Sequence, residues 1–178
     1  MQLRIIDEPQ IDPELDSAIK QNLALCYPDH RDIYSKTRVY DDNVPSYSVI
    51  LQQGQTIIAH VAVMDRTISV GQIPLHIAGV ANVSVLPQYR GKALSSQVVN
   101  ASMEEAKKRA FDFGLLFTSQ PVKKVYTRCG WQVAEDRKVI KTENGQTFEM
   151  PDTVIKMYYS LQNLPFPKGS INLQGKDW

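Results

Sequence analysis

The sequence lacks the patterns that mark several large classes of protein. It holds 2 cysteines and 3 histidines; Cys26 and Cys129 are isolated and the histidines are scattered, so no zinc pattern is complete. No apolar run approaches the length of a membrane span, and residues 1–7 lack the charged start and long apolar stretch of a secretory signal. A formal net charge of +1 gives no reason to expect nucleic acid or an acidic membrane as a partner. We therefore expect a cytoplasmic protein without a metal.

Two common phosphate-binding motifs are also absent. Neither G-x-x-x-x-G-K-[ST] nor G-x-G-x-x-G occurs in the chain. No internal repeat, low-complexity tract or linker divides it. With 178 residues, of which 43% are hydrophobic and 22% charged, the chain has the size and composition of one globular domain spanning residues 1–178.

A different phosphate-binding pattern is present in residues 83–94. A β-branched run ends at a proline, a short polar turn follows, and an amphipathic helix is expected to begin around Gly91. A helix N-terminus presents unpaired N–H groups and the positive end of the helix dipole, which together attract a phosphate. Gly91 and Ala93 are small enough to let an anion approach the backbone, while Arg90 and Lys92 add positive charge. The alternative is a plain helix start with a flexible entry.

The segment that follows predicts a helix, a buried strand and a second short helix. Apolar and small residues recur at helical spacing over about residues 92–113, and Gly114 is placed to end that helix in a left-handed cap. Residues 115–118 form a short apolar run that is typical of a buried strand. Residues 122–131 then predict a short helix that carries Tyr126 and ends at a Gly-Trp pair.

These two segments together resemble the core of the GNAT acyltransferase superfamily. The spacing Gln88-x-x-Gly91-x-Ala93 is similar to the loop with which its members bind the pyrophosphate of acyl-coenzyme A, and Tyr126 before the Gly-Trp pair is similar to the second half of that core. The resemblance implies an α/β (α+β) GNAT fold, with a mixed, mostly antiparallel central sheet flanked by helices. It also implies acetyl-CoA as co-substrate, held by Val83, Ser84, Val85, Gln88, Arg90, Gly91, Lys92, Ala93, Leu94 and Ser95.

The rest of the chain predicts one long helix and further strands. Asp12 is a good helix N-cap with a proline at the first helical position, and Pro28 stops that helix. Residues 29–45 are polar and predict an irregular stretch with a helical turn. Asn144-Gly145 is a strong hairpin signal. Strands are expected at residues 3–6, 46–52, 56–70, 73–85, 139–142, 146–150 and 153–161.

The last segment, residues 162–178, is rich in Pro, Gly and Asn. Chain ends of this composition are commonly disordered. Leu173 and Trp178 belong to a set of apolar residues that would be unusual in a solvated tail. We therefore expect this tail to pack back on the body of the domain.

A closer resemblance covers the segment Ala59 to Arg66. It looks like the central hairpin of aminoglycoside 2'-N-acetyltransferases and of the rhizobial nodulation acyltransferase, and the C-terminal Trp also matches the former. The first group would imply acetyl transfer to an amine. Those enzymes carry a Glu, suited to act as general base through water, on the strand before the pyrophosphate loop. Here the matching position is Ala81, with Asn82 beside it, so the acceptor differs or the base comes from elsewhere.

The reaction itself sets the remaining assignments. The amine must lose a proton, the tetrahedral oxyanion must be stabilised, and the thiolate must be helped to leave. By resemblance, a backbone N–H of Val83 or Ser84 meets the oxyanion, and Tyr126 is the general acid; the alternative for Tyr126 is a core residue packed against the CoA arm. The general base stays open among His60, His76, Asp32, Asp65, water near Asn82 and the carboxylate of Trp178. Candidate acceptor-side residues are Asp32, Ala81, Asn82, Ser119 and Trp178.

Two classes of function remain at this stage. The first is an N-acetyltransferase that acts on a primary amine of a small molecule, aminoglycoside-like or other. The second is a catalytically weak acyl-CoA-binding protein that senses or regulates, which the missing strand carboxylate favours. Transfer of a longer acyl chain is a third possibility, set by the length of the pocket. A homodimer is compatible with each of them.

Overall fold

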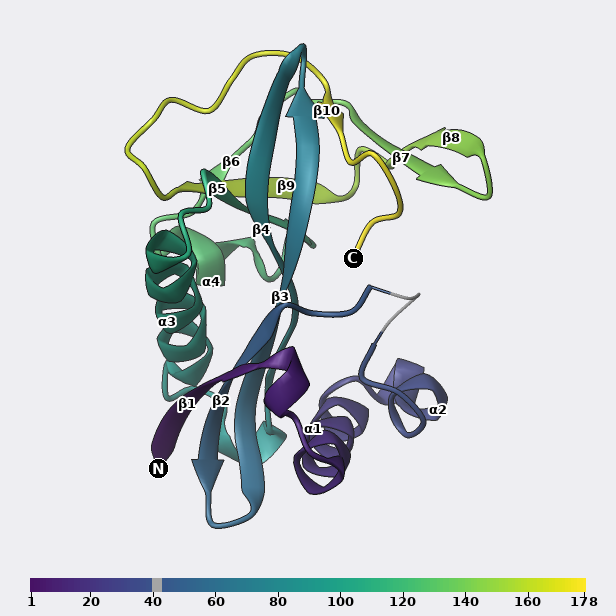
Figure 1. The fold of residues 1–178 in the computed structure, drawn as a ribbon. Helices are drawn as coiled ribbons and strands as arrows, with labels where there is room; N and C mark the ends of the chain where they lie inside the picture. Colours follow the sequence, from purple (N-terminus) through teal and green to yellow (C-terminus); the bar gives the residue numbers. More distant parts are fainter. Residues whose placement is uncertain (40–42) are drawn as a thin grey trace. The chain divides into compact units, whose positions relative to one another are not determined.

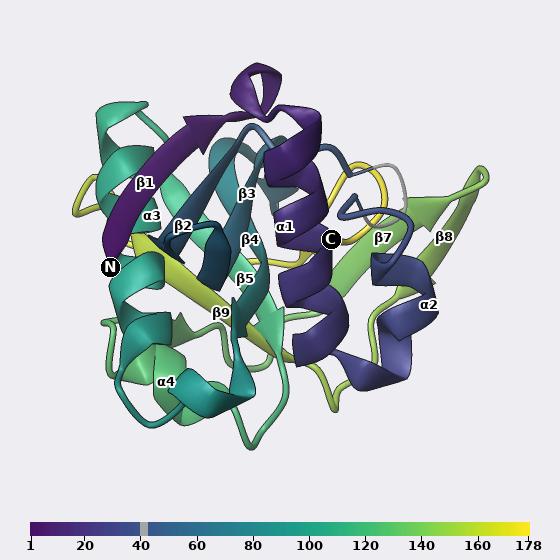
Figure 2. The same cartoon turned by 90° about the horizontal axis from the view of Figure 1, so that it is seen from below.

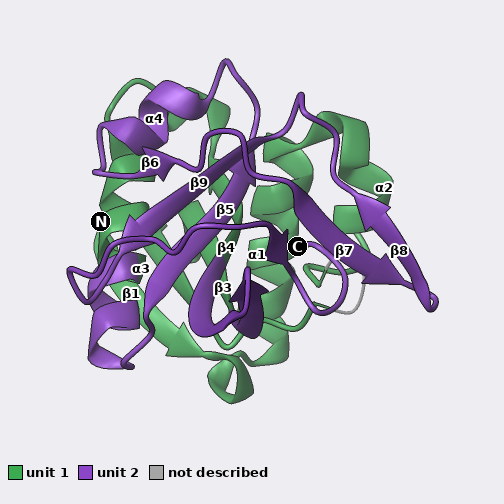
Figure 3. Ribbon diagram, turned by 90° about the horizontal axis from the view of Figure 1, so that it is seen from above, with its two compact units in different colours: residues 1–64, 80–102 green, residues 65–79, 103–178 purple. Residues whose placement is uncertain are grey.

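The computed structural model of this chain describes residues 1–39 and 43–178 (Figure 1). Contacts divide it into two compact units, which Figure 3 colours separately. Unit 1 comprises residues 1–64 and 80–102, and unit 2 comprises residues 65–79 and 103–178. Tyr40, Asp41 and Asp42, which belong to the polar stretch of the sequence, lie outside the described residues. Within the described part, no helix is long and apolar enough to cross a membrane.

The strands of the described residues form one sheet, in the order β6-β9-β5-β4-β3-β10-β7-β8, with β2 beside β3 and β1 beside β2. Among pairs of known register, β7 and β10 run parallel, and the other pairs are antiparallel. The predicted α+β class, with a mixed, mostly antiparallel sheet flanked by helices, is confirmed. The strands are β1 Gln2–Asp7, β2 Tyr47–Gln53, β3 Thr56–Val70, β4 Ile73–Val85, β5 Phe113–Thr118, β6 Gln132–Val133, β7 Val139–Glu143, β8 Gln146–Glu149, β9 Ile155–Ser160 and β10 Ile171–Asn172.

In unit 1, one helix packs on the face of β1, β2 and β3. The α1 helix (Pro13–Cys26) begins as predicted, because the Asp12 carboxylate accepts a hydrogen bond from the Leu15 N–H at 2.8 Å. Figure 2 shows this helix in full, with β1 and β2 to its left. Leu15, Ile19 and Leu23, spaced by about one helical turn, are buried in one cluster with apolar residues of the strands. The 3₁₀ turn η2 (Pro28–His30) and the short α2 helix (Arg31–Tyr34) follow. They correspond to the helical turn that was predicted within residues 29–45.

In unit 2, the hairpin of β7 and β8 forms as predicted around Asn144-Gly145. Both turn residues have positive φ, 50° and 76°, which is the geometry of a two-residue hairpin turn. The β9 strand pairs with β5 and β6. The core of this unit includes Phe113, Leu115 and Val139. The strand predicted at residues 153–161 is β9 (Ile155–Ser160). A further short strand, β10, follows it in the chain.

One predicted helix was placed wrongly at its C-terminal end. The α3 helix runs Leu94–Lys108, several residues shorter than the 92–113 pattern predicted. The left-handed residue after it is Ala110, with φ 60°, and Gly114 lies inside β5. Phe113 is an apolar core residue of β5. Its position in the sequence happens to continue the helical spacing of the apolar residues in α3, so the pattern did not distinguish strand from helix.

The tail returns to the sheet through β10. Ile171 pairs with Val70 of β3 and with Val139 of β7, and both Ile171 and Leu173 are fully buried. Trp178 packs against Phe117 with ring centroids 5.2 Å apart. It also lies so close to Gly79 that a Cβ there would come within 2.6 Å of the indole.

Replacing Trp178 by Ala should therefore destabilise the protein although it changes the last residue. The indole is only partly buried, so we expect about 2 kcal/mol, less than the 3–5 kcal/mol typical of a core Trp. Chemical denaturation measures this loss. Phe148→Ala, which changes an exposed aromatic side chain of β8, is the control and should cost less than about 0.5 kcal/mol. Equal midpoints for the Trp178→Ala protein and the parent protein would show that this end of the tail is frayed.

Candidate functional site

In unit 1, β4 leads into a loop whose backbone is in left-handed conformations at two positions. After the η3 turn (Pro87–Tyr89), Gly91 has φ 79° and Ala93 has φ 56°. A left-handed conformation is ordinary for glycine but costs of order 1–3 kcal/mol in other residues, and it persists where the surrounding structure demands it. Leu94 is the first residue of α3. The left-handed residues just before it therefore determine the direction in which the chain enters the helix.

The loop carries positive charge and no nearby carboxylate on its helix. Arg90 and Lys92 are exposed; the Arg90 guanidinium donates to the Val85 carbonyl at 3.1 Å, and the Lys92 ammonium lies 5.5 Å from the Tyr89 ring centre. The first turn of α3 contains no acidic residue. A helix N-terminus with this surrounding charge suits a phosphate group. The predicted cofactor residues from Gln88 to Ala93 are all exposed.

Upstream of the loop, Asn82 interrupts the extended backbone of β4. Its φ is 52°, which an Asn tolerates better than most residues. The Asn82 side chain accepts a hydrogen bond from the Tyr34 hydroxyl at 2.7 Å and donates one to the Arg38 carbonyl at 3.3 Å. Its neighbour Ala81 is partly buried and offers no ionisable group. Asn82 is therefore a structural feature of the strand as well as a candidate acceptor-side residue.

Ser84 turns its side chain into unit 1. Its hydroxyl donates to the Asn22 side-chain oxygen at 2.5 Å, and the Asn22 amide donates to the Ile57 carbonyl at 2.8 Å. Ser84 is 3% exposed. Its hydroxyl is therefore committed to α1, so any contact of Ser84 with a cofactor is left to its backbone.

His60, a base candidate from the sequence, is bound at both ring nitrogens. Nδ1 lies 3.1 Å from the Asn82 carbonyl oxygen and Nε2 lies 3.2 Å from Ser48 Oγ. A carbonyl can only accept, so Nδ1 carries the proton and Nε2 accepts from the Ser48 hydroxyl. Burial lowers the pKa of His60 to about 4, against the stabilising effect of the Asn82 carbonyl and together with the nearby Arg38 charge. A neutral, buried imidazole with both nitrogens engaged is not free to take a proton from an amine.

The lowered pKa of His60 makes stability depend on pH in a definite direction. The unfolded chain takes up the proton near pH 6.5 and the folded protein only near pH 4, so stability is full above pH 6.5 and falls as the pH drops toward 4. The contribution is about 3 kcal/mol. We expect the difference in unfolding free energy between pH 7 and pH 4, from urea titrations, to shrink by about that amount in His60→Asn. If the difference in unfolding free energy between the two pH values were the same in His60→Asn and in the parent protein, His60 would not be the source of the pH dependence.

Unit 1 also holds a buried ionic cluster that the sequence did not reveal. Arg38 is 7% exposed; it pairs with Glu8 through two guanidinium nitrogens and with Asp16 at 2.7 Å. Its neighbours raise the pKa of Arg38 above its usual value despite burial. Asp32, by contrast, is exposed on α2. A buried Arg in a polar segment gives no periodic signal, so only the folded chain identifies it.

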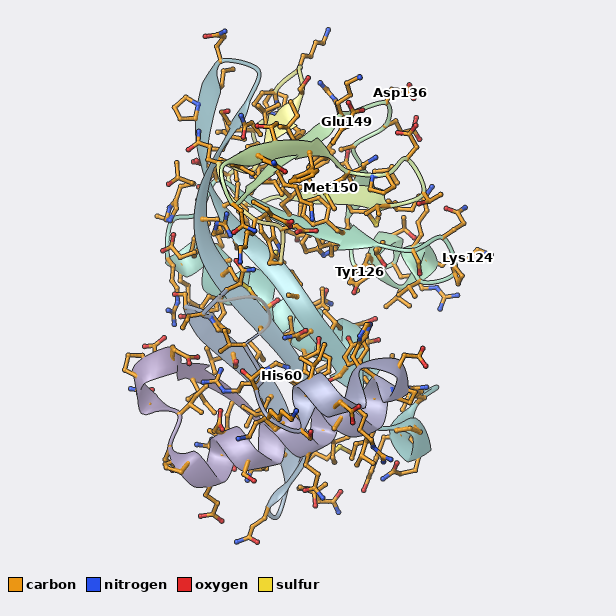
Figure 4. The ribbon with its side chains drawn as sticks, turned by 90° about the vertical axis from the view of Figure 1, so that its right-hand side faces the viewer. His60, Lys124, Tyr126, Asp136, Glu149 and Met150 are labelled. Carbon is orange, nitrogen blue, oxygen red and sulfur yellow. The ribbon has the colours of Figure 1, made fainter. Side chains whose placement is uncertain are left out.

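In unit 2, the short α4 helix (Lys123–Thr127) presents Tyr126 inward, while Lys124 on the same helix is exposed (Figure 4). Tyr126 is 8% exposed and packs edge-on against Trp131, ring centres 6.2 Å apart. Its hydroxyl has no hydrogen-bond partner among the residues that the structure describes. Burial, and secondarily Cys129, raise the pKa of Tyr126 to about 12, so the phenol keeps its proton at neutral pH.

The other candidates of unit 2 lie in separate environments. Ser119 is exposed, and its carbonyl accepts from the first N–H groups of the α4 turn. Trp178 lies under the Arg66 guanidinium, 5.2 Å from the ring centre, and its buried indole N–H has no partner in the described part of the chain. His76 and Asp65 form an exposed pair at 2.7 Å, so His76, unlike His60, remains available as a base.

Neither of two surface grooves is lined by a predicted site residue. One, of about 610 Å³, is lined by residues including Asp136, Glu149 and Lys156; the other, of about 180 Å³, lies between α1 and the ends of β1 and β2. Within residues 1–39 and 43–178, no cluster of three or more His, Cys, Asp or Glu side chains could hold a metal. The candidate site is therefore described by its loop and by the chemistry of its side chains.

The family of the chain is shown by a match that covers most of its sequence. The family model described as an acetyltransferase (GNAT) domain matches residues 14–134, a span that includes β4, the loop, α3 and Tyr126. The chain belongs to the GNAT acetyltransferase family. A comparison with curated proteins finds no match.

Solved structures share the fold at low sequence identity. Aminoglycoside 6'-acetyltransferase type Ii is 16% identical, with a TM-score of 0.65 over 94% of this chain and 100% of that one. ElaA of Escherichia coli is 12% identical, with a TM-score of 0.64 over 89% and 99%. A GNAT family acetyltransferase of Brucella melitensis, in complex with acetyl-CoA, is 14% identical, with a TM-score of 0.63 over 96% and 94%. At these identities the likeness shows the fold and no shared substrate.

Proposed function

We propose that this protein is an acetyl-CoA-dependent N-acyltransferase that moves an acetyl group to a primary amine of a small molecule. The observation that carries the proposal is the loop between β4 and α3, inside the segment that the GNAT family model matches. There, left-handed Gly91 and Ala93 precede a helix N-terminus that has positive charge and no acidic residue beside it. Such a helix N-terminus suits a phosphate or pyrophosphate group.

The proposed roles follow the order of the reaction. The loop from Gln88 to Ser95 holds the pyrophosphate of the cofactor, and the backbone of Val83, Ser84 and Val85 meets its acyl arm. The free amine attacks the thioester carbonyl, and a backbone N–H of β4 stabilises the oxyanion that forms. The attacking nitrogen, which carries a positive charge once the C–N bond has formed, loses a proton to the general base. As the intermediate collapses, the C–S bond breaks and Tyr126 gives its proton to the departing sulfur. The products are the N-acetylated amine and CoA.

The acceptor is proposed at the level of its chemistry. The sequence around Ala59 to Arg66 and the C-terminal Trp178 support an aminoglycoside-like amine, and exposed Asp32 supplies a carboxylate that suits an ammonium group. Ala81 removes the strand carboxylate that would serve as base. With His60 engaged at both nitrogens, the remaining side-chain candidates for the base are His76, Asp65 and Asp32.

A second function is supported by the same missing carboxylate. A GNAT protein that binds acyl-CoA but has no efficient base would serve as a sensor or regulator of acyl-CoA. It would share the cofactor loop with the first proposal and differ from it in turnover.

One experiment separates the two. The purified protein is incubated with acetyl-CoA and a panel of amines that includes aminoglycosides, polyamines and amino-acid amides, while thiol release is followed; CoA occupancy is measured in parallel by native mass spectrometry. Turnover with an amine supports the enzyme, and longer acyl-CoA donors then test the chain length. Occupancy without turnover supports the sensor. Absence of both would reject the proposed function.

A further inference from the structure

Two consecutive carbonyl oxygens of β4 are bound by side chains from other elements of unit 1. The Asn82 carbonyl accepts from His60 Nδ1 of β3 at 3.1 Å. The Val83 carbonyl accepts from the hydroxyl of Tyr27, the residue after α1, at 2.7 Å. Figure 4 marks the position of His60 on its strand. Side chains at these two carbonyls are unusual, because most backbone groups of a sheet bond to other backbone groups.

Each of these carbonyls shares a rigid plane with the next N–H. A peptide group is planar, and no peptide bond of the described chain is cis, so the C=O of residue 82 and the N–H of Val83 point in opposite directions in one plane. Fixing the oxygen therefore fixes the direction of the hydrogen. A hydrogen bond to the oxygen also polarises the N–H, since linked hydrogen bonds strengthen one another. His60 acts in this way on the Val83 N–H. Tyr27 binds the carbonyl at the other end of Val83 and so restrains the same residue from its C-terminal side. The next N–H, that of Ser84, points to the opposite edge of the extended strand, toward β3, as the Leu86 N–H does when it donates to the Ile58 carbonyl.

The backbone conformation of Asn82, which precedes these two peptide groups, is itself held by side-chain contacts. Its left-handed backbone is a strained state that persists only where several contacts hold it. Its side-chain oxygen and nitrogen are both bonded, to Tyr34 and Arg38, and its carbonyl is bonded to His60. Three contacts from three residues thus specify one backbone conformation.

We propose that His60 and Tyr27 are positioning residues that hold Val83 at both of its peptide groups and so aim its backbone N–H at the oxyanion of the acyl-transfer reaction. The inference rests on the proposed function for the existence of the oxyanion. The orientation of the backbone N–H follows from the hydrogen bonds of the structure. His60 suits this task because it is buried and neutral, with its proton on Nδ1. The Ser48 hydroxyl, 3.2 Å from Nε2, maintains that tautomer.

The first test compares two substitutions at His60. His60→Leu removes the donor to the Asn82 carbonyl, whereas His60→Asn places a side-chain amide N–H near the position of Nδ1. Loss of an oxyanion donor typically lowers kcat by about 10²–10³-fold, and misaiming it should cost roughly 10–100-fold. We expect that loss in His60→Leu, with the affinity for CoA unchanged by calorimetry, and recovery of most of the rate in His60→Asn. Equal rates in the two variants would overturn the role of His60.

The second test does not depend on changing the buried imidazole. Tyr27→Phe removes the hydroxyl that holds the Val83 carbonyl and keeps the ring. The matched control is Tyr47→Phe, which removes another tyrosine hydroxyl of unit 1, bonded at 2.8 Å to the carbonyl of Ser102 in α3. We expect Tyr27→Phe to lower kcat by about tenfold and Tyr47→Phe to lower only the melting temperature. If both variants keep the parent kcat, Tyr27 does not position a donor.

A third measurement needs no activity at all. In ¹⁵N–¹H spectra of the labelled protein, the amide resonance of Val83 should move in His60→Leu, and that of Ser84 in Tyr27→Phe, while both stay in place in Tyr47→Phe. Resonances that do not move would overturn the aiming even in an active enzyme. Resonances that move in a protein that neither binds CoA nor turns over acetyl-CoA would uphold the aiming and reject the proposed function. The two failures are thus distinguishable.

Discussion

Tyr126→Phe should lower kcat by about 10²–10⁴-fold, the usual contribution of general acid catalysis, with little change in the affinity for CoA. Phe keeps the ring and its edge-on packing against Trp131, and deletes only the proton that the departing sulfur would take. Burial raises the pKa of Tyr126 to about 12, so the phenol is protonated throughout the neutral range. The hydroxyl also has no partner among the residues that the structure describes, so its removal breaks no hydrogen bond within them.

That last point separates the catalytic role from a structural one. A structural Tyr that lost a hydrogen bond would lose roughly 0.5–1.5 kcal/mol of stability, and kcat would hardly change. Here we expect the reverse, an unchanged melting temperature and a reduced kcat. Tyr159→Phe is the matched control, because Tyr159 also packs against Trp131, with the two ring centres 5.7 Å apart. A near-parental kcat in Tyr126→Phe would defeat its assignment as the acid.

The elements that local patterns specify were predictable from the sequence. Runs rich in β-branched and apolar residues, bounded by turn residues such as Gly54 and Gly71, gave β3 and β4 with their observed bounds. The chemistry of single residues gave the Asp12 cap and the turn at Asn144-Gly145. The end of α3 was not predictable, because Ala110 and Phe113 continue the helical spacing of the apolar residues, although Ala110 lies beyond the helix and Phe113 begins β5. Periodicity reports burial, and burial does not distinguish the two.

The polar interior of unit 1 was beyond the reach of local patterns. His60 is a histidine on a strand in the sequence, equally suited to catalysis and to a buried hydrogen bond; only its contacts with Asn82 and Ser48, 22 and 12 residues away, decide between them. The same holds for Tyr27, whose partner Val83 is 56 residues distant. Such pairs depend on the tertiary fold, and a short motif carries no information about them. The strand, turn and helix start around Gly91 could be predicted because all the residues involved are adjacent in sequence; that this loop binds the cofactor stays a prediction.

The cofactor loop provides the sharpest test of the proposed function. Gly91→Val should weaken CoA binding by roughly 10²–10³-fold, about 3–4 kcal/mol. Gly91 has φ 79°, where a β-branched residue is strained, so the variant loop would leave the conformation that directs its N–H groups to the phosphates. The Val side chain would also occupy space that is empty in the free protein, since a Cβ at Gly91 meets nothing within 4 Å.

Gly145→Val is the matched control for this substitution. Gly145 has φ 76°, and a side chain there would likewise find open space around its Cβ, but Gly145 lies in the turn between β7 and β8 rather than in the loop. Both substitutions should impose a comparable backbone strain, of order 1–3 kcal/mol, so a shared loss of stability would not explain a difference in binding. Calorimetric titration with CoA, on variants whose far-UV spectra match the parent, measures that difference. If Gly91→Val bound CoA as tightly as Gly145→Val does, the pyrophosphate would not lie against this loop.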